Sequence, residues 1–421
     1  MAKVRVALIG AGNRGLDVYG RYTLEHPYIM EFVGIAEPNE VRREKFAELH
    51  KIKENFQFSS WEDLFSIPKF CDAVLIATPD NLHYEPAMKA IELGYKILLE
   101  KPISNNIEEC VQLTKQSEES SASLSVCHVL RYTPFFSKIK ELIQEGKIGE
   151  IVSIQHNENV AYWHQAHSFV RGNWNSSKES SPMILAKCCH DMDILAWLIG
   201  KKCLKISSFG SLKHFKPENA PANSTLKCTD GCPAEGGCCY SALKIYMGKD
   251  GWPTNVVSQD TSSEVVLNAL KNGPYGNCVY KCNNDVVDHQ VVNMLFEDGI
   301  TVAFTMCAFT KDCTRTIKIM GTKGEIRGAM EKNTIEVLDF LSGNTQTISI
   351  VTEGGHSGGD ESIMKEFTES VYNGENKKTL TDISLSLQSH LMAFAAERSR
   401  ISGEIIDLEK FEREIISNID K

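Results

Sequence analysis

A G-x-G-x-x-G pattern of glycines follows an apolar run at residues 4–9. In this setting Gly10 permits a tight turn after a strand, and Gly12 lets backbone N–H groups approach a pyrophosphate. Gly15 lets the next helix pack closely on the sheet, and the N-terminus of that helix directs partial positive charge at the phosphates. The pattern therefore predicts a dinucleotide site. We expect its contacts to include Gly10, Gly12, Asn13, Arg14 and Gly15.

An acidic residue ends the second apolar run, at residues 32–36. Glu37 follows the glycines by about twenty residues, where a carboxylate can bind the ribose hydroxyls of a dinucleotide. Such a carboxylate would repel a 2′-phosphate, so NAD is favoured over NADP. Three arginines could instead accommodate that phosphate, although their ordinary interpretation is that of solvent-exposed helix charges. They are Arg14, Arg42 and Arg43.

A second chemical feature is the tripeptide Glu100-Lys101-Pro102, which follows an apolar run at 96–99. The proline fixes the backbone and cannot continue a ladder of strand hydrogen bonds, so Lys101 projects from a rigid strand end. There its amine can hydrogen-bond a substrate and the nicotinamide ribose; the alternative is a surface lysine before a turn. Further residues expected near the cofactor are Thr78, Asn81, His83, Glu100, Lys101 and His128.

Short apolar runs alternate with helical patterns in this part of the chain. Residues 41–50, 61–65 and 85–93 are typical of helices, and 73–77 and 96–99 of buried parallel strands. Successive strand-helix-strand units form a doubly wound sheet, in which ligands bind outside the carboxyl ends of the strands. The sequence thus predicts an α/β protein with an N-terminal Rossmann doubly wound parallel sheet, and it places the motifs above at one edge of that sheet.

Composition narrows the class of protein. The chain has 421 residues, 42% of them hydrophobic and 24% charged, which is enough for a large core and two domains. A net charge of −10 argues against nucleic acid and membranes as partners. No apolar run is long enough to span a bilayer and no signal-peptide pattern begins the chain, so a cytoplasmic location is expected. The 14 cysteines are then expected as reduced thiols or metal ligands.

These motifs resemble a known family, that of glucose-fructose oxidoreductase, inositol dehydrogenase and rhizopine catabolism, written Gfo/Idh/MocA. The resemblance covers nearly the whole chain. Besides the glycine pattern and Glu100-Lys101-Pro102, it is carried by 77–83, Arg131 with Tyr132, 146–149, His190 with Asp193, and 321–324.

The resemblance implies a fold and an activity. The Rossmann domain is expected at 1–130, and a substrate-binding and oligomerisation domain at 131–421. This second α/β domain should contain a large open, mostly antiparallel sheet, which often forms an oligomer interface, so a homodimer or homotetramer is expected. The implied activity is NAD(P)-dependent oxidation or reduction of a sugar, cyclitol or related polyol carbon.

The resemblance also implies a catalytic pair. A secondary alcohol loses its hydroxyl proton to a base as hydride leaves for nicotinamide. The family's histidine falls at His190 and pairs with Lys101. Many polyol dehydrogenases of the family carry an aspartate four residues before this histidine, where this chain has Ala186. The adjacent Lys187 could lower the pKa of His190 or bind an anionic or carbonyl group of the substrate; a solvated lysine is the alternative.

Residues 162–174 are rich in polar and aromatic side chains and match neither helical nor strand periodicity. A loop of this composition suits a carbohydrate, because rings stack on C–H faces and polar groups bind hydroxyls. A packed loop with core tryptophans is the equal alternative. Substrate contacts are expected from Arg131, Tyr132, His167, Arg171, Trp174 and Lys187.

Cysteines are concentrated in an expected insertion near 215–285, a feature that also occurs in an uncharacterised branch of the family. A structural zinc ion bound by three of them and one further ligand would anchor this irregular segment. The short spacings differ from the ligand pairs of zinc fingers, so free thiols and a disulfide are alternatives. The candidate ligands are Cys228, Cys232 and Cys238.

Three functions are compatible with this pattern. The first is hydride transfer between NAD(P) and a carbohydrate-like substrate. The second is a redox-assisted glycosidase or lyase that oxidises a sugar hydroxyl with bound NAD, eliminates, and re-reduces, with no net cofactor turnover. The third is a non-catalytic NAD-sensing regulatory protein, which the presence of both Lys101 and His190 makes the weakest interpretation.

Overall fold

A computed structural model describes residues 3–120, 122–351, 355–374 and 378–419. Its first sheet has six parallel strands in the order β3-β2-β1-β4-β5-β6. The central strands are buried apolar runs, as is typical of parallel strands covered by helices on both faces. The strands are β1 Val4–Ile9, β2 Met30–Ala36, β3 Gln57–Phe58, β4 Ala73–Ile76, β5 Lys96–Leu99 and β6 Leu124–Val126.

Helices connect these strands in the right order for a doubly wound fold. The connection after β1 is the π-helix η1, Arg14–Gly20, followed by α1, Arg21–Glu25. The later helices are α2 Glu40–His50, α3 Trp61–Ser66, α4 Tyr84–Glu92 and α5 Ile107–Glu119. The predicted helices and strands of this region are therefore confirmed, with ends that differ by one or two residues.

Two glycines of the fingerprint are required by the backbone. Gly10 has a φ of +93°, and a Cβ atom there would lie 2.7 Å from the carbonyl oxygen of Ala77 at the end of β4. A Cβ atom at Gly15 would overlap the carbonyl oxygen of Gly10. The turn between β1 and η1 can therefore form only with glycine at both positions.

The second sheet has nine strands in the order β14-β13-β12-β11-β7-β10-β9-β8-β15. The β7–β10 pair is parallel and the other pairs are antiparallel. Side chains alternate between buried and exposed along β9, β10 and β11, so one face packs on helices and the other faces outward. The strands are β7 Ile151–Asn159, β8 Cys203–Ser211, β9 His289–Phe296, β10 Thr301–Cys307, β11 Thr314–Gly321, β12 Gly324–Ala329, β13 Thr334–Asp339, β14 Thr345–Ser349 and β15 Ile406–Asp407.

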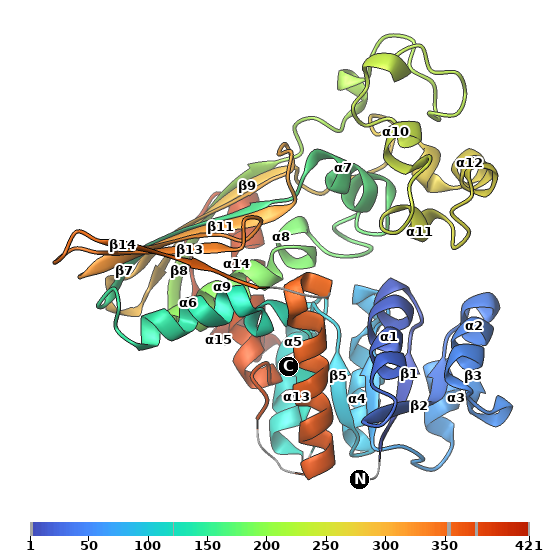
Figure 1. The fold of residues 1–421 in the computed structure, drawn as a ribbon, viewed down its shortest axis with the longest axis horizontal. Helices are drawn as coiled ribbons and strands as arrows, with labels where there is room; N and C mark the ends of the chain where they lie inside the picture. Colours follow the sequence, from blue (N-terminus) through green and yellow to red (C-terminus); the bar gives the residue numbers. More distant parts are fainter. Residues whose placement is uncertain (1–2, 121, 352–354, 375–377, 420–421) are drawn as a thin grey trace.

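The covered face of this sheet contacts helices from several parts of the chain (Figure 1). They are α6 Pro134–Gln144, α8 Met183–Ala186, α9 Cys189–Ile199, α14 Ile383–Ser402 and α15 Leu408–Ile419. Helix α14 packs on β8, α9 and α5, and so joins the two sheets. The predicted fold class, a Rossmann sheet followed by an α/β domain with a large, mostly antiparallel sheet, is confirmed.

Residues 212–288, between β8 and β9, form a separate lobe that includes the predicted insertion at 215–285. Its short helices are α10 Ala242–Tyr246, α11 Thr254–Val257 and α12 Ser263–Asn272. The lobe has its own apolar cluster, which includes Phe215, Tyr246 and Leu270. In Figure 1 it extends beyond one end of the large sheet, with α11 on the side that faces α1 and α2.

The end of the chain returns to the first sheet. Helix α13, Gly359–Asn373, contacts β1 and η1 and stands beside the Rossmann strands in Figure 1. The division into domains at 1–130 and 131–421 therefore stays a prediction. Residues after 355, which belong to the predicted second domain, pack on the first sheet. Among the described residues, no helix is long and apolar enough to cross a membrane.

Candidate active site

Lys101 meets the segment that carries His190 at the carboxyl edge of the first sheet. The amine of Lys101, two residues beyond β5, donates a hydrogen bond of 2.7 Å to the carbonyl oxygen of Ala186. Ala186 ends α8, and His190 lies in the first turn of α9 with only 7% of its surface exposed. The structure thus brings the two predicted catalytic residues to one region, from elements far apart in sequence.

Glu100 anchors the backbone beside Lys101. One carboxylate oxygen accepts hydrogen bonds from Arg14 Nε, at 2.5 Å, and from the hydroxyl of Tyr19, while the other accepts from the backbone N–H of Lys101 at 3.0 Å. Burial alone would raise the pKa of Glu100, but the charge of Arg14 and the Tyr19 hydrogen bond outweigh it and lower the pKa. Arg14 also pairs with Asp360 of α13 at 2.8 Å. Two residues predicted to contact the cofactor, Arg14 and Glu100, therefore contact each other.

Two buried histidines lie behind this site. His390 of α14 accepts a hydrogen bond from the backbone N–H of Ile103 at 2.9 Å, and its other ring nitrogen lies 3.1 Å from the carbonyl oxygen of Ser386. Burial lowers the pKa of His390 to about 3, so its ring is neutral, with the proton on Nδ1. His390 thereby fixes the turn that follows Lys101. No local sequence pattern marks it, because Ile103 and His390 are 287 residues apart.

His128 stands between His390 and His190, with ring centroids 5.5 Å and 5.9 Å away, respectively. Burial and the charges of Arg131 and Lys101 lower its pKa well below the ordinary value. Both its ring nitrogens are buried without a hydrogen-bond partner in the described part of the chain. His128 is therefore an uncharged, buried ring next to His190. Its contact with the cofactor stays a prediction.

Arg131 and Tyr132 are held by protein groups. The guanidinium of Arg131 forms two hydrogen bonds with the carboxylate of Asp193, at 2.8 and 2.6 Å, and a third with the carbonyl oxygen of Leu380. The hydroxyl of Tyr132 donates to the carboxylate of Glu366 on α13. A buried guanidinium needs a counter-ion, and Asp193 supplies it. The structure gives both residues a role in attaching the C-terminal helices, and their predicted contacts with the substrate stay a prediction.

Lys187 belongs to a buried set of paired charges. Its amine lies 3.4 Å from a carboxylate oxygen of Glu158 on β7, and Arg315 of β11 pairs with Glu158 at 2.6 Å and with Asp191 at 2.8 Å. Burial lowers the pKa of Lys187, but the charge of Glu158 outweighs it and the pKa is raised. Lys187 is therefore a fixed cation close to α9. Ala186 has no carboxylate, and Glu158 and Asp191 supply acids to this region instead. Sequence reasoning missed Glu158.

Residues 162–171 of the segment 162–174 are helical, which corrects the prediction of a loop for this part. They form α7, Tyr162–His164, and the π-helix η5, Gln165–Arg171. A π-helix has i→i+5 hydrogen bonds, so its side chains do not follow the 3.6-residue period that indicates an α-helix. Single π-turns of this kind are frequent at functional sites.

Three predicted substrate residues of this segment attach it to its surroundings. His167 Nδ1 lies 2.9 Å from the hydroxyl of Tyr246, and Arg171 donates hydrogen bonds of 2.7 Å to the carbonyl oxygens of Asn277 and Tyr240 in the insertion. The indole N–H of Trp174 lies 3.2 Å from the carboxylate of Asp80, at the end of the Rossmann strand β4. The segment therefore ties the insertion to the Rossmann domain.

The remaining predicted cofactor residues lie at the carboxyl edge. Glu37 accepts hydrogen bonds from the N–H groups of Ala11, at 2.7 Å, and Asn39, at 2.9 Å. His83 bridges the ends of β4 and β5, because its ring nitrogens lie 2.9 Å from the carbonyl oxygen of Thr78 and 2.7 Å from that of Pro102. Two further members of the set are exposed or partly exposed at this edge, Asn13 and Asn81.

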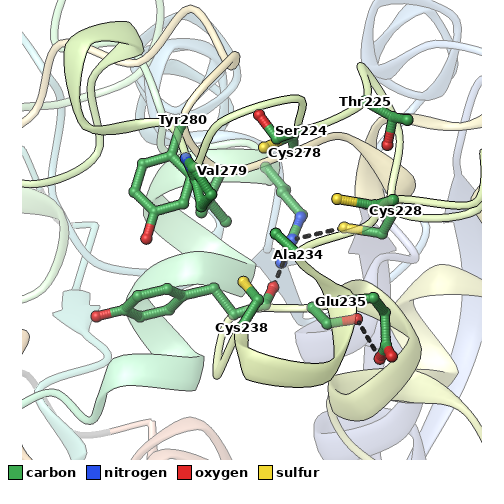
Figure 2. Close-up of a pocket in the computed structure, with 14 residues that line it drawn as sticks. Ser224, Thr225, Cys228, Ala234, Glu235, Cys238, Cys278, Val279 and Tyr280 are labelled. Atoms are coloured by element: carbon green, nitrogen blue, oxygen red, sulfur yellow. Dashed lines mark hydrogen bonds between the residues drawn. The ribbon is translucent and has the colours of Figure 1, made fainter.

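Cysteines of the insertion surround a small cavity together with Arg171 (Figure 2). The guanidinium of Arg171 lies 3.7 Å from the sulfur of Cys228, and a cation at this distance opposes a metal ion at the same sulfur. No three histidine, cysteine or acidic side chains of the described ranges are placed to hold a metal ion. The predicted zinc site at Cys228, Cys232 and Cys238 is therefore not supported. All 14 cysteines are free thiols, which agrees with the first alternative.

Comparison with family models covers both sheets. Residues 4–128 match the model for the NAD-binding Rossmann fold of an oxidoreductase family, and residues 140–408 match the model for its C-terminal alpha/beta domain. The chain belongs to the Gfo/Idh/MocA family. As a member, it is an NAD(P)-dependent oxidoreductase, which sets the non-catalytic alternative aside.

Curated relatives of this Gfo/Idh/MocA protein differ in how much of it they match. It is 24% identical to the protein YteT of Bacillus subtilis over 344 residues, which is 77% of this chain and 78% of YteT. It is 31% identical to 2,7-anhydro-N-acetylneuraminate hydratase of Escherichia coli over 150 residues, which is 35% of this chain and 39% of the hydratase. Among solved structures, levoglucosan dehydrogenase in complex with NADH and levoglucosan superposes with a TM-score of 0.71 at 18% identity, over 97% of this chain and all of the other. That likeness shows the same fold.

The fingerprint turn fits the dinucleotide that the family model implies. A Cβ atom at Gly12 would meet no other heavy atom within 4 Å, so the space beside this turn is open to phosphates. Glu37 is fixed beside the turn by its bond from Ala11, where it can accept from ribose hydroxyls. In this Gfo/Idh/MocA protein the residues present are thus suited to hold the cofactor.

Proposed function

We propose that the protein transfers a hydride between NAD and a secondary hydroxyl or keto carbon of a sugar, cyclitol or sugar derivative. The observation that carries this proposal is the hydrogen bond from Lys101 to the carbonyl oxygen of Ala186, which joins the end of β5 to the segment that carries His190. Two groups able to bind one substrate oxygen then flank the edge of the sheet where the family's dinucleotide lies. NAD rather than NADP follows from the position of Glu37.

In this mechanism, NAD held at the glycine turn and Glu37 would supply the nicotinamide for hydride transfer. Lys101 hydrogen-bonds the reacting oxygen and orients it, since Glu100 fixes its backbone N–H and His390 fixes the next turn. His190 takes the hydroxyl proton as the carbonyl forms and returns it in the reverse direction. Lys187 stays charged because of Glu158, so it serves to bind substrate oxygens rather than to exchange protons.

An assay of two readouts tests the proposal. The protein is incubated with NAD and a panel of sugars, cyclitols and aryl glycosides, and both nicotinamide absorbance and glycoside cleavage are followed. Substrate-dependent NADH formation without cleavage supports hydride transfer to the cofactor as the net reaction. Cleavage with no accumulation of NADH supports the alternative below.

A second function, a redox-neutral elimination or hydration with retained NAD, is favoured by one feature of the site. The acid common in polyol dehydrogenases is replaced by Ala186, and a fixed cation, Lys187, stands beside it. A cation there would stabilise the enolate formed when a proton is lost next to a transient ketone. The hydratase among the relatives also supports a redox-neutral elimination or hydration, and its match spans about a third of this chain.

We also propose that the protein forms a homodimer or homotetramer through the outward face of the nine-stranded sheet. Phe209 of β8, 67% exposed, lies opposite the exposed Val291 of β9 on this face. Exposed apolar residues that are adjacent on a sheet mark an interaction surface. Light scattering of the wild type and of Phe209→Glu tests this: an oligomer that dissociates in the variant supports the interface, and a monomeric wild type contradicts it.

A further inference from the structure

Five rings from two segments form a continuous group that we call the aromatic row. Trp163, His164 and His167 come from α7 and η5, and Trp252 and Tyr275 come from the insertion. The ring of Trp252 lies 5.2 Å from Trp163, 4.9 Å from His164 and 5.5 Å from His167, measured between centroids. His167 in turn stacks on Tyr275 at 5.0 Å. Trp252 is therefore the centre of the row.

Trp252 is exposed although its supports are fixed. Its exposed fraction is 43%, whereas His167 is buried and bound to the hydroxyl of Tyr246, itself fully buried. The planes of His164 and His167 stand nearly perpendicular to the indole, at 85° and 86°. An indole held by edge-to-face contacts loses little conformational entropy when a ligand covers it. The side chain is thus a rigid apolar surface open to solvent.

One end of the aromatic row adjoins the candidate active site. His164 lies 3.3 Å from the sulfur of Cys313, and burial together with the charge of Lys187 lowers its pKa well below the ordinary value. Cys313 precedes Arg315 by two residues, and Arg315 pairs with Asp191, the neighbour of His190 in sequence. This end of the row is therefore connected to the segment that carries His190 through Cys313 and Arg315.

The other end reaches the Rossmann domain. Gln259, seven residues after Trp252, accepts a hydrogen bond of 2.5 Å from Lys45 on α2. Helix α2 follows Glu37, which we assign to the cofactor ribose. The part of the insertion that carries Trp252 therefore contacts α2 of the first sheet through Gln259 and contacts α7 and η5 through the indole.

We propose that Trp252 is the binding platform for a second sugar ring, so that the substrate is a glycoside of at least two rings. The ring to be oxidised would lie at Lys101 and His190, and the neighbouring ring would stack its C–H face on the indole. The apolar face of a sugar buries hydrophobic area against an aromatic ring while its hydroxyls remain in water. This inference rests on the proposed function, because it extends that substrate beyond the reacting ring.

The test compares paired probes on the full-length protein. Initial rates of NADH formation are measured for glucose, galactose, mannose and xylose and for disaccharides that contain them, with wild type, Trp252→Ala and Trp252→Phe. Phe340→Ala is the matched control, because Phe340 is an exposed ring, 58% accessible, in the turn between β13 and β14. The affinity for NAD is measured in parallel by titration.

We expect wild type to prefer a disaccharide to its parent monosaccharide. Trp252→Ala should lower kcat/KM for that disaccharide by about tenfold, the size of one lost aromatic contact, and leave the monosaccharide within about twofold. Trp252→Phe should restore most of the loss, and Phe340→Ala should change neither value. The affinity for NAD should be the same in all four proteins.

Three results would overturn the platform. The first is a wild type that shows no preference for disaccharides over monosaccharides. The second is an equal decrease of kcat/KM for both kinds of probe in Trp252→Ala. The third is a decrease of NAD affinity alone in Trp252→Ala, which would mean that the aromatic row covers the cofactor. If no probe yields NADH, the proposed function fails. The role of Trp252 as a binding platform is then tested by the binding of the same disaccharides. Saturation-transfer NMR with the same disaccharides supports it when the signal is lost in Trp252→Ala, and rejects it when wild type gives no signal.

Discussion

Arg14 and Glu100 are joined by a hydrogen bond of 2.5 Å although 86 residues separate them in sequence. The first belongs to the turn that would hold the cofactor phosphates, and the second accepts a hydrogen bond from the backbone N–H of Lys101, the proposed catalytic lysine. Cofactor binding and the position of Lys101 are therefore mechanically linked. Asp360 of α13 joins the same cluster, so the C-terminal helix supports it as well.

We predict that Glu100→Gln lowers kcat by about ten- to a hundredfold and also weakens NAD binding. The amide keeps the size of the side chain but loses the charge that holds Arg14. Steady-state kinetics and NAD titration measure both effects. Glu85→Gln, a change on the first turn of α4 away from the cluster, is the control. If Glu100→Gln reduces kcat but leaves NAD affinity intact, the proposed linkage is incorrect.

A second prediction concerns His390 as a positioning residue. His390→Leu removes the acceptor for the N–H of Ile103 and should lower kcat by about tenfold with little change in NAD affinity, because only the turn after Lys101 is disturbed. His390→Gln can still accept this bond and should recover most of the rate. Equal losses in both variants would indicate a packing role instead.

The buried neutral state of His390 also predicts a pH dependence of stability. The folded protein binds this proton only near pH 3, whereas the unfolded chain binds it below about pH 6.5. Stability is thus fully present above pH 6.5 and falls as the pH decreases toward 3. At pH 5 the loss from His390 is about 2 kcal/mol, from 1.36 kcal/mol per pH unit.

Urea unfolding at pH 5 and pH 7.5 measures this effect. The difference in unfolding free energy between the two pH values should be smaller in His390→Gln than in wild type by about 2 kcal/mol. Phe340→Ala, a change at an exposed side chain that does not titrate, should leave the difference unchanged. An unchanged difference in His390→Gln would mean that this ring is already charged in the folded protein.

Glu37 provides a prediction on cofactor choice. Wild type should bind NAD more tightly than NADP. Glu37→Ala should decrease the ratio of the affinity for NAD to that for NADP, because the repulsion between the carboxylate and a 2′-phosphate is removed. Arg43 lies beside the carbonyl oxygen of Glu37 and is available to bind that phosphate in the variant. Fluorescence titration with both reduced cofactors measures the ratio. Tighter binding of NADP by wild type would refute the assignment of Glu37.

Local sequence patterns predicted the first sheet well, because its buried strands are apolar runs between glycine turns and helices. The same reasoning failed for 162–174, since a π-helix lacks the 3.6-residue period. Local patterns also did not place the start of β9 at His289. The residues before it end the insertion, and no change of periodicity marks that junction.

Long-range contacts of the site were beyond prediction from one sequence. Arg14 meets Asp360 across 346 residues, and Glu158 meets Arg315 through strand pairing of β7 with β11. Arg131 was expected at the substrate, but its partner Asp193 is visible only after folding. The predicted zinc likewise rested on the concentration of cysteines in one segment, which does not reveal the guanidinium of Arg171 among the thiols.

The central claim is that Lys101 and His190 act on one substrate oxygen during hydride transfer. The direct test is single-turnover NADH formation with a verified substrate in Lys101→Ala, His190→Ala and the double variant. Each single change should lower the rate by about two to four orders of magnitude with NAD affinity nearly unchanged, and the two losses should not add fully. Near-normal turnover in His190→Ala would contradict the account.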